Sequence, residues 1–383
     1  MNETLRLLDR LIAFPTVSSA SNLELVSWIE SEVSPLNARL RKFPNLAGDK
    51  TNLLVSIGPE EPGGIVWSGH TDVVPVEGQN WSAAPFVMRR KEGKVIGRGA
   101  TDMKGFLACA LAAARSLDLN TLARPLHLAF SYDEEVGCVG AHDMANWLGA
   151  SDLKPQHVIV GEPTGLKLVN VHKGGMIGWA HVHGKTGHSS RPDIYVNSVM
   201  VAADLIAFIS AIRSEMREGP KSPRLDPPYS TIQVNQIHGG TAGNIVPELC
   251  SFFWEMRVIP GAEPQDIFQK ILAYARDVLE PAMKAVDNNC RIDIEPIATI
   301  PALRPNDDIE AERELLAQLN QAEAETKAAG TEAGIFQKAG MPTYILGPGF
   351  TAQSHQPDEF IEEVQLESCT ALLKSFVQRY CCT

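Results

Sequence analysis

Short runs of aliphatic and β-branched residues alternate in this chain with longer segments of helical periodicity. The runs 53–57, 65–68, 126–132 and 157–161 are typical of buried strands, whereas residues 103–117 are rich in Ala and Leu and predict a helix. This alternation favours an α/β fold, in which helices cover a sheet. We therefore expect a main domain built on a mixed sheet with helices on both faces.

The middle of the chain changes character and predicts a second, smaller unit. It reads as one strand, a long helix, two strands and a further helix, at residues 177–183, 196–216, 231–238, 250–258 and 264–286. This βαββα order predicts an α+β domain inserted into the main one. The predicted boundaries are 1–174 for the first part of the main domain, 175–287 for the insert and 288–383 for the second part.

Charge and apolar patterning exclude several classes of protein. The formal net charge of -12 argues against a nucleic-acid partner, because phosphate binding needs a basic face. No segment approaches the roughly 18 uncharged apolar residues of a membrane span, so no membrane partner is expected. The N-terminal residues predict an amphipathic helix and lack the basic start of a signal peptide, so we expect a cytoplasmic protein. The seven cysteines form no CxxC pair, which favours neither a zinc ribbon nor a disulfide framework.

Five short segments each place a possible metal ligand beside a turn, close to the end of a predicted strand or helix. Taken singly, each has an ordinary explanation: a core histidine, a solvated acidic turn or a common loop sequence. Ligands of open α/β sheets bind at the carboxyl ends of strands, which makes the shared position informative. The segments are GHTDVVP (69–75), GRGATDMKG (97–105), DEE (133–135), GEP (161–163) and HQPDE (355–359).

Together the segments offer two histidines and three carboxylates, a balanced supply for two divalent ions that share one carboxylate. Zinc accepts histidine nitrogen and carboxylate oxygen and leaves a position open for water. Two such ions ~3.5–4 Å apart can polarise a carbonyl and activate a water molecule. In the order His70-Thr71-Asp72, the aspartate is placed to receive the second N–H of a ligating histidine.

The five segments, in this order, resemble those of the dinuclear zinc aminoacylase and carboxypeptidase superfamily, the M20-type metallopeptidases, over most of the chain. The resemblance implies that Asp102 bridges the two ions, that Asp72 orients a ligating histidine and that the Asp102–Met103 peptide bond is cis. It also implies Glu134 as the general base, which takes a proton from a metal-bridging water so that the resulting hydroxide attacks an acyl carbonyl. The implied ligand sets are His70, Asp102 and Glu162 for one metal, and Asp102, Glu135 and His355 for the other.

Three residues of the insert also gain expected roles from this resemblance. His188, in the sequence Gly187-His188-Ser189-Ser190, would reach the active site of a partner subunit and help to hold the oxyanion. Asn244, after a glycine-rich turn, and Arg257 would bind the substrate carboxylate, which the guanidinium fork matches. The plainer alternatives are a capping histidine and a solvated strand-end arginine. The insert is thus expected to be a lid and dimerisation domain of a C2 homodimer.

The C-terminal segments resemble those of the acetylornithine deacetylase branch. They are Leu346-Gly347-Pro348-Gly349, HQPDE and Thr331-Glu332-Ala333. The implied reaction removes the acetyl group from a small N-acyl amino acid, N-acetyl-L-ornithine, in arginine biosynthesis. Glu332 is the candidate partner of the substrate amine, and Gly347 is a further candidate for substrate binding. Tyr195, where a glycine is common, and the proline-rich loop 219–228 depart from the pattern without touching a predicted ligand.

Several alternatives stay open at this stage. A succinyl-diaminopimelate desuccinylase or a broader N-acyl-amino-acid aminoacylase would use the same metals, and acetylcitrulline and acetylmethionine are further possible substrates. A non-catalytic binding protein should lack a ligand or the base, whereas all are present here. A purely structural α/β protein would require five coincidences in order. The ligand set suits zinc, and cobalt or manganese could occupy the same sites.

Overall fold

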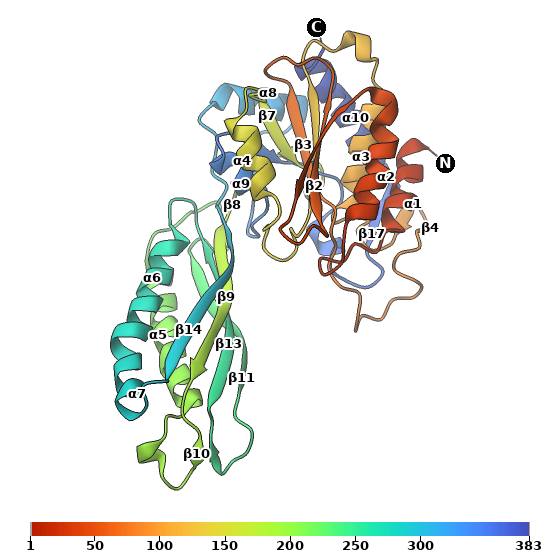
Figure 1. Cartoon of the computed structure of the whole chain (residues 1–383). Coiled ribbons are helices and arrows are strands. Elements are labelled where there is room, and N and C mark those ends of the chain that lie inside the picture. Colours follow the sequence, from red (N-terminus) through yellow and green to blue (C-terminus); the bar gives the residue numbers. More distant parts are fainter. Residues whose placement is uncertain (1, 383) are drawn as a thin grey trace. The chain divides into compact units, whose positions relative to one another are not determined.

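The computed structural model describes residues 2–382 and divides the chain into two compact units (Figure 1). The larger unit comprises Met1–Val171, Leu303–Thr326 and Thr331–Thr383, and the smaller one His172–Ala302 with Lys327–Gly330. The sequence placed the end of the insert at 287, which is too early. The strand Arg291–Ile300 pairs along its length with a strand of the smaller unit, so its backbone hydrogen bonds assign it there.

An eight-stranded mixed sheet forms the centre of the larger unit, in the order β1-β2-β6-β3-β7-β16-β8-β15. The four central strands, β6, β3, β7 and β16, are parallel to one another. On one side of them β2 pairs antiparallel with β6 and with β1, and on the other side β8 pairs antiparallel with β16. The fold class predicted from the sequence is confirmed. The strands are β1 (Arg39–Pro44), β2 (Thr51–Ile57), β3 (Ile65–His70), β6 (Leu126–Ser131), β7 (His157–Val160), β8 (Val169–His172), β15 (Glu325–Lys327) and β16 (Thr343–Ile345).

Helices cover both faces of this sheet. On one face, α3 packs on β3 and is itself covered by α1 and α10, and on the other face α9 packs on β7 and β16 beside α4 (Figure 1). The Ala-rich sequence of α3 explains its central place, because small side chains on every face allow close neighbours on all sides. The helices are α1 (Glu3–Ile12), α2 (Leu23–Val33), α3 (Lys104–Arg115), α4 (His142–Ala150), α8 (Ile309–Gln318), α9 (Ala333–Lys338) and α10 (Glu363–Tyr380).

A small three-stranded sheet, in the order β17-β5-β4, lies beside the chain segment that precedes α3. Its strands are β4 (Arg89–Lys91), β5 (Lys94–Ile96) and β17 (Phe360–Glu362). Because β17 pairs with β5, it brings the C-terminal segment HQPDE next to the segment GRGATDMKG, which follows β5. Two of the five segments singled out in the sequence therefore meet through this sheet.

The smaller unit is a four-stranded antiparallel sheet, in the order β11-β13-β9-β14, with helices on one face (Figure 1). Alternate residues of β9 and β13 point into a core with α5 and α6. The helix expected at 264–286 is interrupted by a π-helical turn at Ala275–Leu279, just before Pro281, which cannot donate to a helical hydrogen bond. The elements are β9 (Gly174–His183), β10 (Gly187–His188), α5 (Ser198–Glu218), β11 (Thr231–Gly239), β12 (Ile245–Val246), β13 (Leu249–Val258), α6 (Pro264–Tyr274), α7 (Glu280–Val286) and β14 (Arg291–Ile300).

All seven cysteines are unpaired, and six of them are buried. Among residues 2–382, no helix combines the length and the apolar character that crossing a bilayer requires.

Candidate metal centre

The five predicted ligands meet at one edge of the large sheet. His70 ends β3, Glu135 lies in the turn after β6, and Glu162 follows β7 by two residues. Because β6, β3 and β7 are parallel neighbours, their carboxyl ends and the turns that follow them lie together. Asp102 stands in the turn before α3, and His355 stands between β16 and β17.

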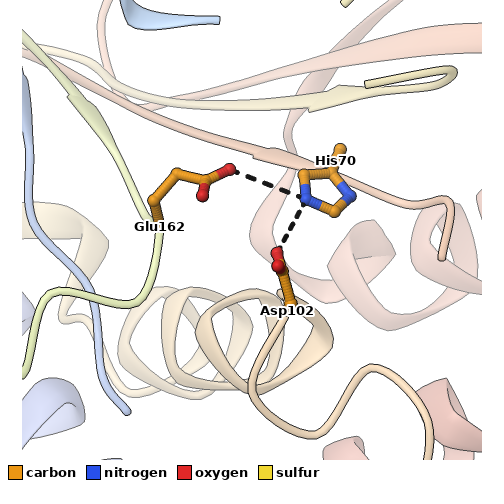
Figure 2. A group of neighbouring side chains, drawn as sticks. All are labelled: His70, Asp102 and Glu162. Atoms are coloured by element: carbon orange, nitrogen blue, oxygen red, sulfur yellow. Dashed lines mark hydrogen bonds and ion pairs between the residues drawn. The ribbon is translucent and has the colours of Figure 1, made fainter. Parts of the chain in front are cut away.

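The first group of donors is buried inside this edge. His70 Nε2 lies 3.2 Å from Asp102 Oδ1 and 3.7 Å from Glu162 Oε1. Figure 2 draws both contacts as dashed lines. All three residues are buried, so their polar atoms are largely removed from water. One nitrogen and two carboxylates converge here, which is the donor set of a zinc site with room for a further ligand.

The second group uses the other oxygen of the same aspartate. His355 Nε2 lies 3.3 Å from Asp102 Oδ2 and 3.1 Å from Glu135 Oε2. Within each group, one donor atom per residue lies within 4.8 Å of the donor atoms of the other two. The two oxygens of Asp102 thus face different histidines, which is the arrangement that a bridging carboxylate requires. The Asp102–Met103 peptide bond is cis, as the resemblance implied.

Asp72 lies at this centre, but its carboxylate does not hold the ring of His70. The Nδ1 atom of His70 is 2.9 Å from the backbone carbonyl oxygen of Asp72 and 3.7 Å from the carboxylate. The carboxylate instead accepts the backbone N–H groups of Glu134 and Glu135, at 3.1 and 3.2 Å, and the hydroxyl of Ser18 at 2.7 Å. Asp72 therefore fixes the acidic turn that follows β6, and its backbone orients the histidine.

Glu134, the predicted general base, lies in the same turn as Glu135, one of the predicted ligands. Its Oε1 accepts a hydrogen bond from the thiol of Cys138 at 3.3 Å. Burial of the carboxyl group, together with the negative charge of Glu162, raises the pKa of Glu134 well above its usual value. A carboxyl group with a raised pKa holds a proton more readily, which suits a group that takes up a proton and returns it.

The electrostatics of the centre show an excess of negative charge. Burial and the charge of Asp102 raise the pKa of Glu135 to about 7. Hydrogen bonds to Asp102 and Glu135 raise the pKa of His355 to about 10. Burial alone would lower the pKa of His70, but the hydrogen bond to Asp102 and the nearby carboxylates raise it overall. Divalent cations would neutralise this charge, so the donors and their charge both fit a pair of metal ions.

The predicted residues of the insert fall into two places within the smaller unit. β10 pairs with β12, so His188 lies opposite Ile245, and the backbone oxygen of Asn244 accepts the N–H of Ser189. His188 Nδ1 contacts the hydroxyl of Ser190 at 2.8 Å. Both His188 and Asn244 are exposed.

Arg257 lies elsewhere in the same unit. It lies on β13, eight residues from Leu249, the first residue of that strand and the one next to β12 in the sequence. Eight residues of strand span about 27 Å. The Nε of Arg257 donates to Glu255. The smaller unit therefore places Arg257 apart from His188 and Asn244.

The two remaining candidates are buried in the larger unit. Glu332 accepts a hydrogen bond from the hydroxyl of Ser131 at 2.8 Å, and burial raises its pKa to about 7. Gly347 donates to the hydroxyl of Thr164, and its carbonyl oxygen accepts the N–H of Leu166. A Cβ atom on Gly347 would lie 2.0 Å from the carbonyl oxygen of Gly161, so a glycine is needed for packing. The roles of both residues in substrate binding stay predictions.

Sequence reasoning gave no role to two buried charged residues of the same segments. Glu359, the last residue of HQPDE, and Arg98, the second residue of GRGATDMKG, form an ion pair of 2.7 Å with both side chains almost fully buried. The sequence carries a weak signal for them, since both stand in segments already singled out. It could not show that they pair, because they stand 261 residues apart in the chain.

Comparisons with known proteins agree with this geometry. Residues 66–379 match the profile of the peptidase family M20/M25/M40. An acetylornithine deacetylase of Buchnera aphidicola subsp. Acyrthosiphon pisum is 33% identical over 380 residues, covering 97% of this chain and 96% of that protein. The metallo-carboxypeptidase Sso-CP2 of Sulfolobus solfataricus superposes with a TM-score of 0.74 at 19% identity, covering 99% of both chains. YXEP of Bacillus subtilis, a dinuclear metal binding peptidase, superposes with a TM-score of 0.66 at 15% identity, covering 97% of this chain and 96% of that one.

Proposed function

Because this chain belongs to the peptidase family M20/M25/M40, we propose that it removes the acetyl group from an N-acetyl amino acid, with N-acetyl-L-ornithine as substrate. The products would be L-ornithine and acetate, a step of arginine biosynthesis. The observation that carries the reaction class is the pair of donor groups that share Asp102. The choice of substrate is supported by the 33% identity to an acetylornithine deacetylase over 97% of the chain.

The proposed cofactor is a pair of divalent ions, zinc or cobalt. His70, Asp102 and Glu162 would hold one ion, and Asp102, Glu135 and His355 the other. When bound, such a pair supplies Lewis-acid polarisation of the acyl carbonyl and lowers the pKa of a water molecule.

Glu134 is the proposed proton carrier of the reaction. Its carboxylate would take a proton from the water as the new C–O bond forms to the acyl carbon. It would then give this proton to the amide nitrogen, so that the C–N bond breaks and the amine leaves. The turn that carries Glu134 is held by Asp72, which keeps the base next to the ligand Glu135. The thiol of Cys138 contacts Glu134 Oε1, and this leaves Oε2 as the atom proposed to carry the proton.

We also propose a homodimer in which each active site uses residues of both protomers. Arg257 pairs with Gly175, close to His172, the residue at which the smaller unit begins. His188 lies at the opposite end of the sheet. One substrate molecule is too small to contact both ends of β13, so His188 and Arg257 of one protomer would serve different sites. The strand β11 is an edge of its sheet, and Ile237 on it is 51% exposed, as expected of a strand that pairs with a second copy.

The test is amine release from N-acetyl-L-ornithine by the purified protein, before and after chelation and with zinc or cobalt added back. Metal-dependent release faster than that from succinyl-diaminopimelate or N-acetylmethionine is expected. A faster rate on one of those substrates would move the assignment to a desuccinylase or a general aminoacylase. Activity that survives complete chelation would overturn the metal-dependent reaction itself.

The variant Glu134→Gln separates the proton carrier from the metal ligands. It should bind the metal ions with wild-type stoichiometry and lose ~10²–10⁴-fold in kcat, the usual contribution of a general base. A wild-type rate would remove Glu134 from the mechanism. Sedimentation would test the dimer: Ile237→Lys should release monomers with low activity, and a fully active monomer would contradict the shared site.

A further inference from the structure

The ion pair of Arg98 and Glu359 is buried beside the metal centre, and neither residue belongs to the two donor groups. Its partners lie 2.7 Å apart, and both residues have 0% exposure. A buried ion pair is costly to form, and a well-packed apolar pair of similar volume is often equally stable. Burial of this pair therefore calls for an explanation other than stability, and its hydrogen bonds provide one.

Glu359 holds the turn that carries Asp102. Its Oε1 accepts the backbone N–H groups of Thr101 and Asp102, at 2.9 and 3.0 Å, and its Oε2 accepts that of Gly99 at 3.1 Å. No apolar side chain could satisfy these buried donors, and a buried N–H group left without an acceptor is destabilising. The carboxylate thus fixes the backbone from which the shared aspartate projects.

Arg98 connects the same carboxylate to the turn that carries His355. Its Nη2 donates to Gln79 Oε1, and its guanidinium lies 4.9 Å from the ring centre of Trp81. Gln79 in turn donates from Nε2 to the backbone oxygen of His355, at 3.0 Å. The side chain of His355 is 52% exposed and contacts Asp102 and Glu135, while the contact from Gln79 holds its backbone.

The geometry points to Arg98, Glu359 and Gln79 as a positioning network that sets the spacing between Asp102 and His355. We propose that the network determines how tightly the second group of donors, Asp102, Glu135 and His355, binds a divalent ion. The inference rests on the proposed function, since it assumes that both donor groups bind metal. Polar groups that orient metal ligands typically contribute 10–100-fold to metal affinity.

The experiment titrates the metal-free full-length protein with Co²⁺ in competition with a chromophoric chelator, which resolves the first and second equivalents. His355→Ala identifies the equivalent that belongs to the second group. Gln79→Ala removes the contact to His355 and leaves the buried pair intact. Glu359→Gln removes the acceptor for the turn of Asp102. Glu363→Gln is the matched control, because it is also a glutamate paired with an arginine, Arg90, but at the surface.

Gln79→Ala should weaken the second equivalent about 10-fold or more and leave the first unchanged, whereas Glu359→Gln should weaken both, since Asp102 is shared. The control should match the wild type. If Glu359→Gln fails to fold, Gln79→Ala decides. A lower melting temperature with unchanged Co²⁺ affinities would show that the network is only a structural brace, and would overturn the inference. A wild-type protein that binds fewer than two Co²⁺ ions would instead refute the dinuclear function, and the inference with it.

Discussion

A buried histidine on β6 should make the stability of the fold depend on pH. His127 lies between β2 and β3, where its Nδ1 contacts the hydroxyl of Ser56 at 2.8 Å. Its Nε2 is buried and has no hydrogen-bond partner among the residues that the structure describes. A second proton on the ring would therefore have no acceptor. Burial, with a smaller contribution from the charge of Arg39, lowers the pKa of His127 from 6.5 to about 4.

The sign and the size of the effect follow from this difference. Between pH 4 and 6.5 the unfolded chain binds a proton at His127 and the folded chain does not, so stability falls as the pH falls through this range. At about 1.4 kcal/mol per pKa unit, the full loss is roughly 3 kcal/mol below the folded-state pKa. Between pH 7.5 and pH 5.0 the same relation gives a loss of about 2 kcal/mol.

The substitution His127→Asn removes the titration and keeps a side-chain nitrogen near Ser56. Urea unfolding of the metal-free proteins at pH 7.5 and 5.0 would measure the free energy of unfolding without a contribution from metal loss. The variant should be less stable at pH 7.5, but should lose about 2 kcal/mol less than the wild type on acidification. Contributions from His157 and His172, whose pKa values burial also lowers to about 4, are common to both proteins and cancel. Equal pH dependence in the two proteins would refute the reasoning.

Three further predictions concern the metal centre and its surroundings. Gly161→Ala should lower stability by ~1–3 kcal/mol in thermal unfolding, since the new Cβ would lie 2.0 Å from the ring of Phe106, which is buried and packed in the core. Zn²⁺ at 100 times its dissociation constant should raise the free energy of unfolding by about 2.7 kcal/mol, and Asp102→Asn should abolish most of this gain in calorimetry. Asp72→Asn should lower kcat by ~10–100-fold with an unchanged circular dichroism spectrum, because the acidic turn loses one of its acceptors; an unchanged kcat would contradict this role.

Much of the fold could be predicted because local patterns and tertiary structure agree. The strand runs at 53–57, 65–68 and 126–132 lie within one or two residues of β2, β3 and β6. The end of the insert could not be predicted, because β14 alternates weakly and contains Pro296 beside a register shift. Its assignment depends on pairing with β9, a contact between residues more than a hundred positions apart.

The site shows a similar division. The family resemblance of the five segments implied the two donor groups, and the structure brings those residues together around Asp102. The role of Asp72 was predicted only in part, because the sequence cannot distinguish a backbone oxygen from a carboxylate as the acceptor of a histidine N–H. Asn244 and Arg257 were both expected to bind the substrate carboxylate, and only the register of the sheet shows how far apart they lie in one protomer.

Acidic residues in this centre divide into donors and anchors according to their neighbours, and the distinction has a physical basis. Asp102 and Glu135 have histidine nitrogens within 3.3 Å, so their lone pairs converge with those of another ligand on one point. Asp72 and Glu359 are instead occupied by backbone N–H groups. A carboxylate occupied in this way has little capacity left for a metal ion, but it fixes a turn that has no regular secondary structure of its own. Since every donor here stands at a strand end or in a turn, the anchors determine whether the donors stay close enough to share a metal, and substitution of an anchor should displace a ligand without removing one.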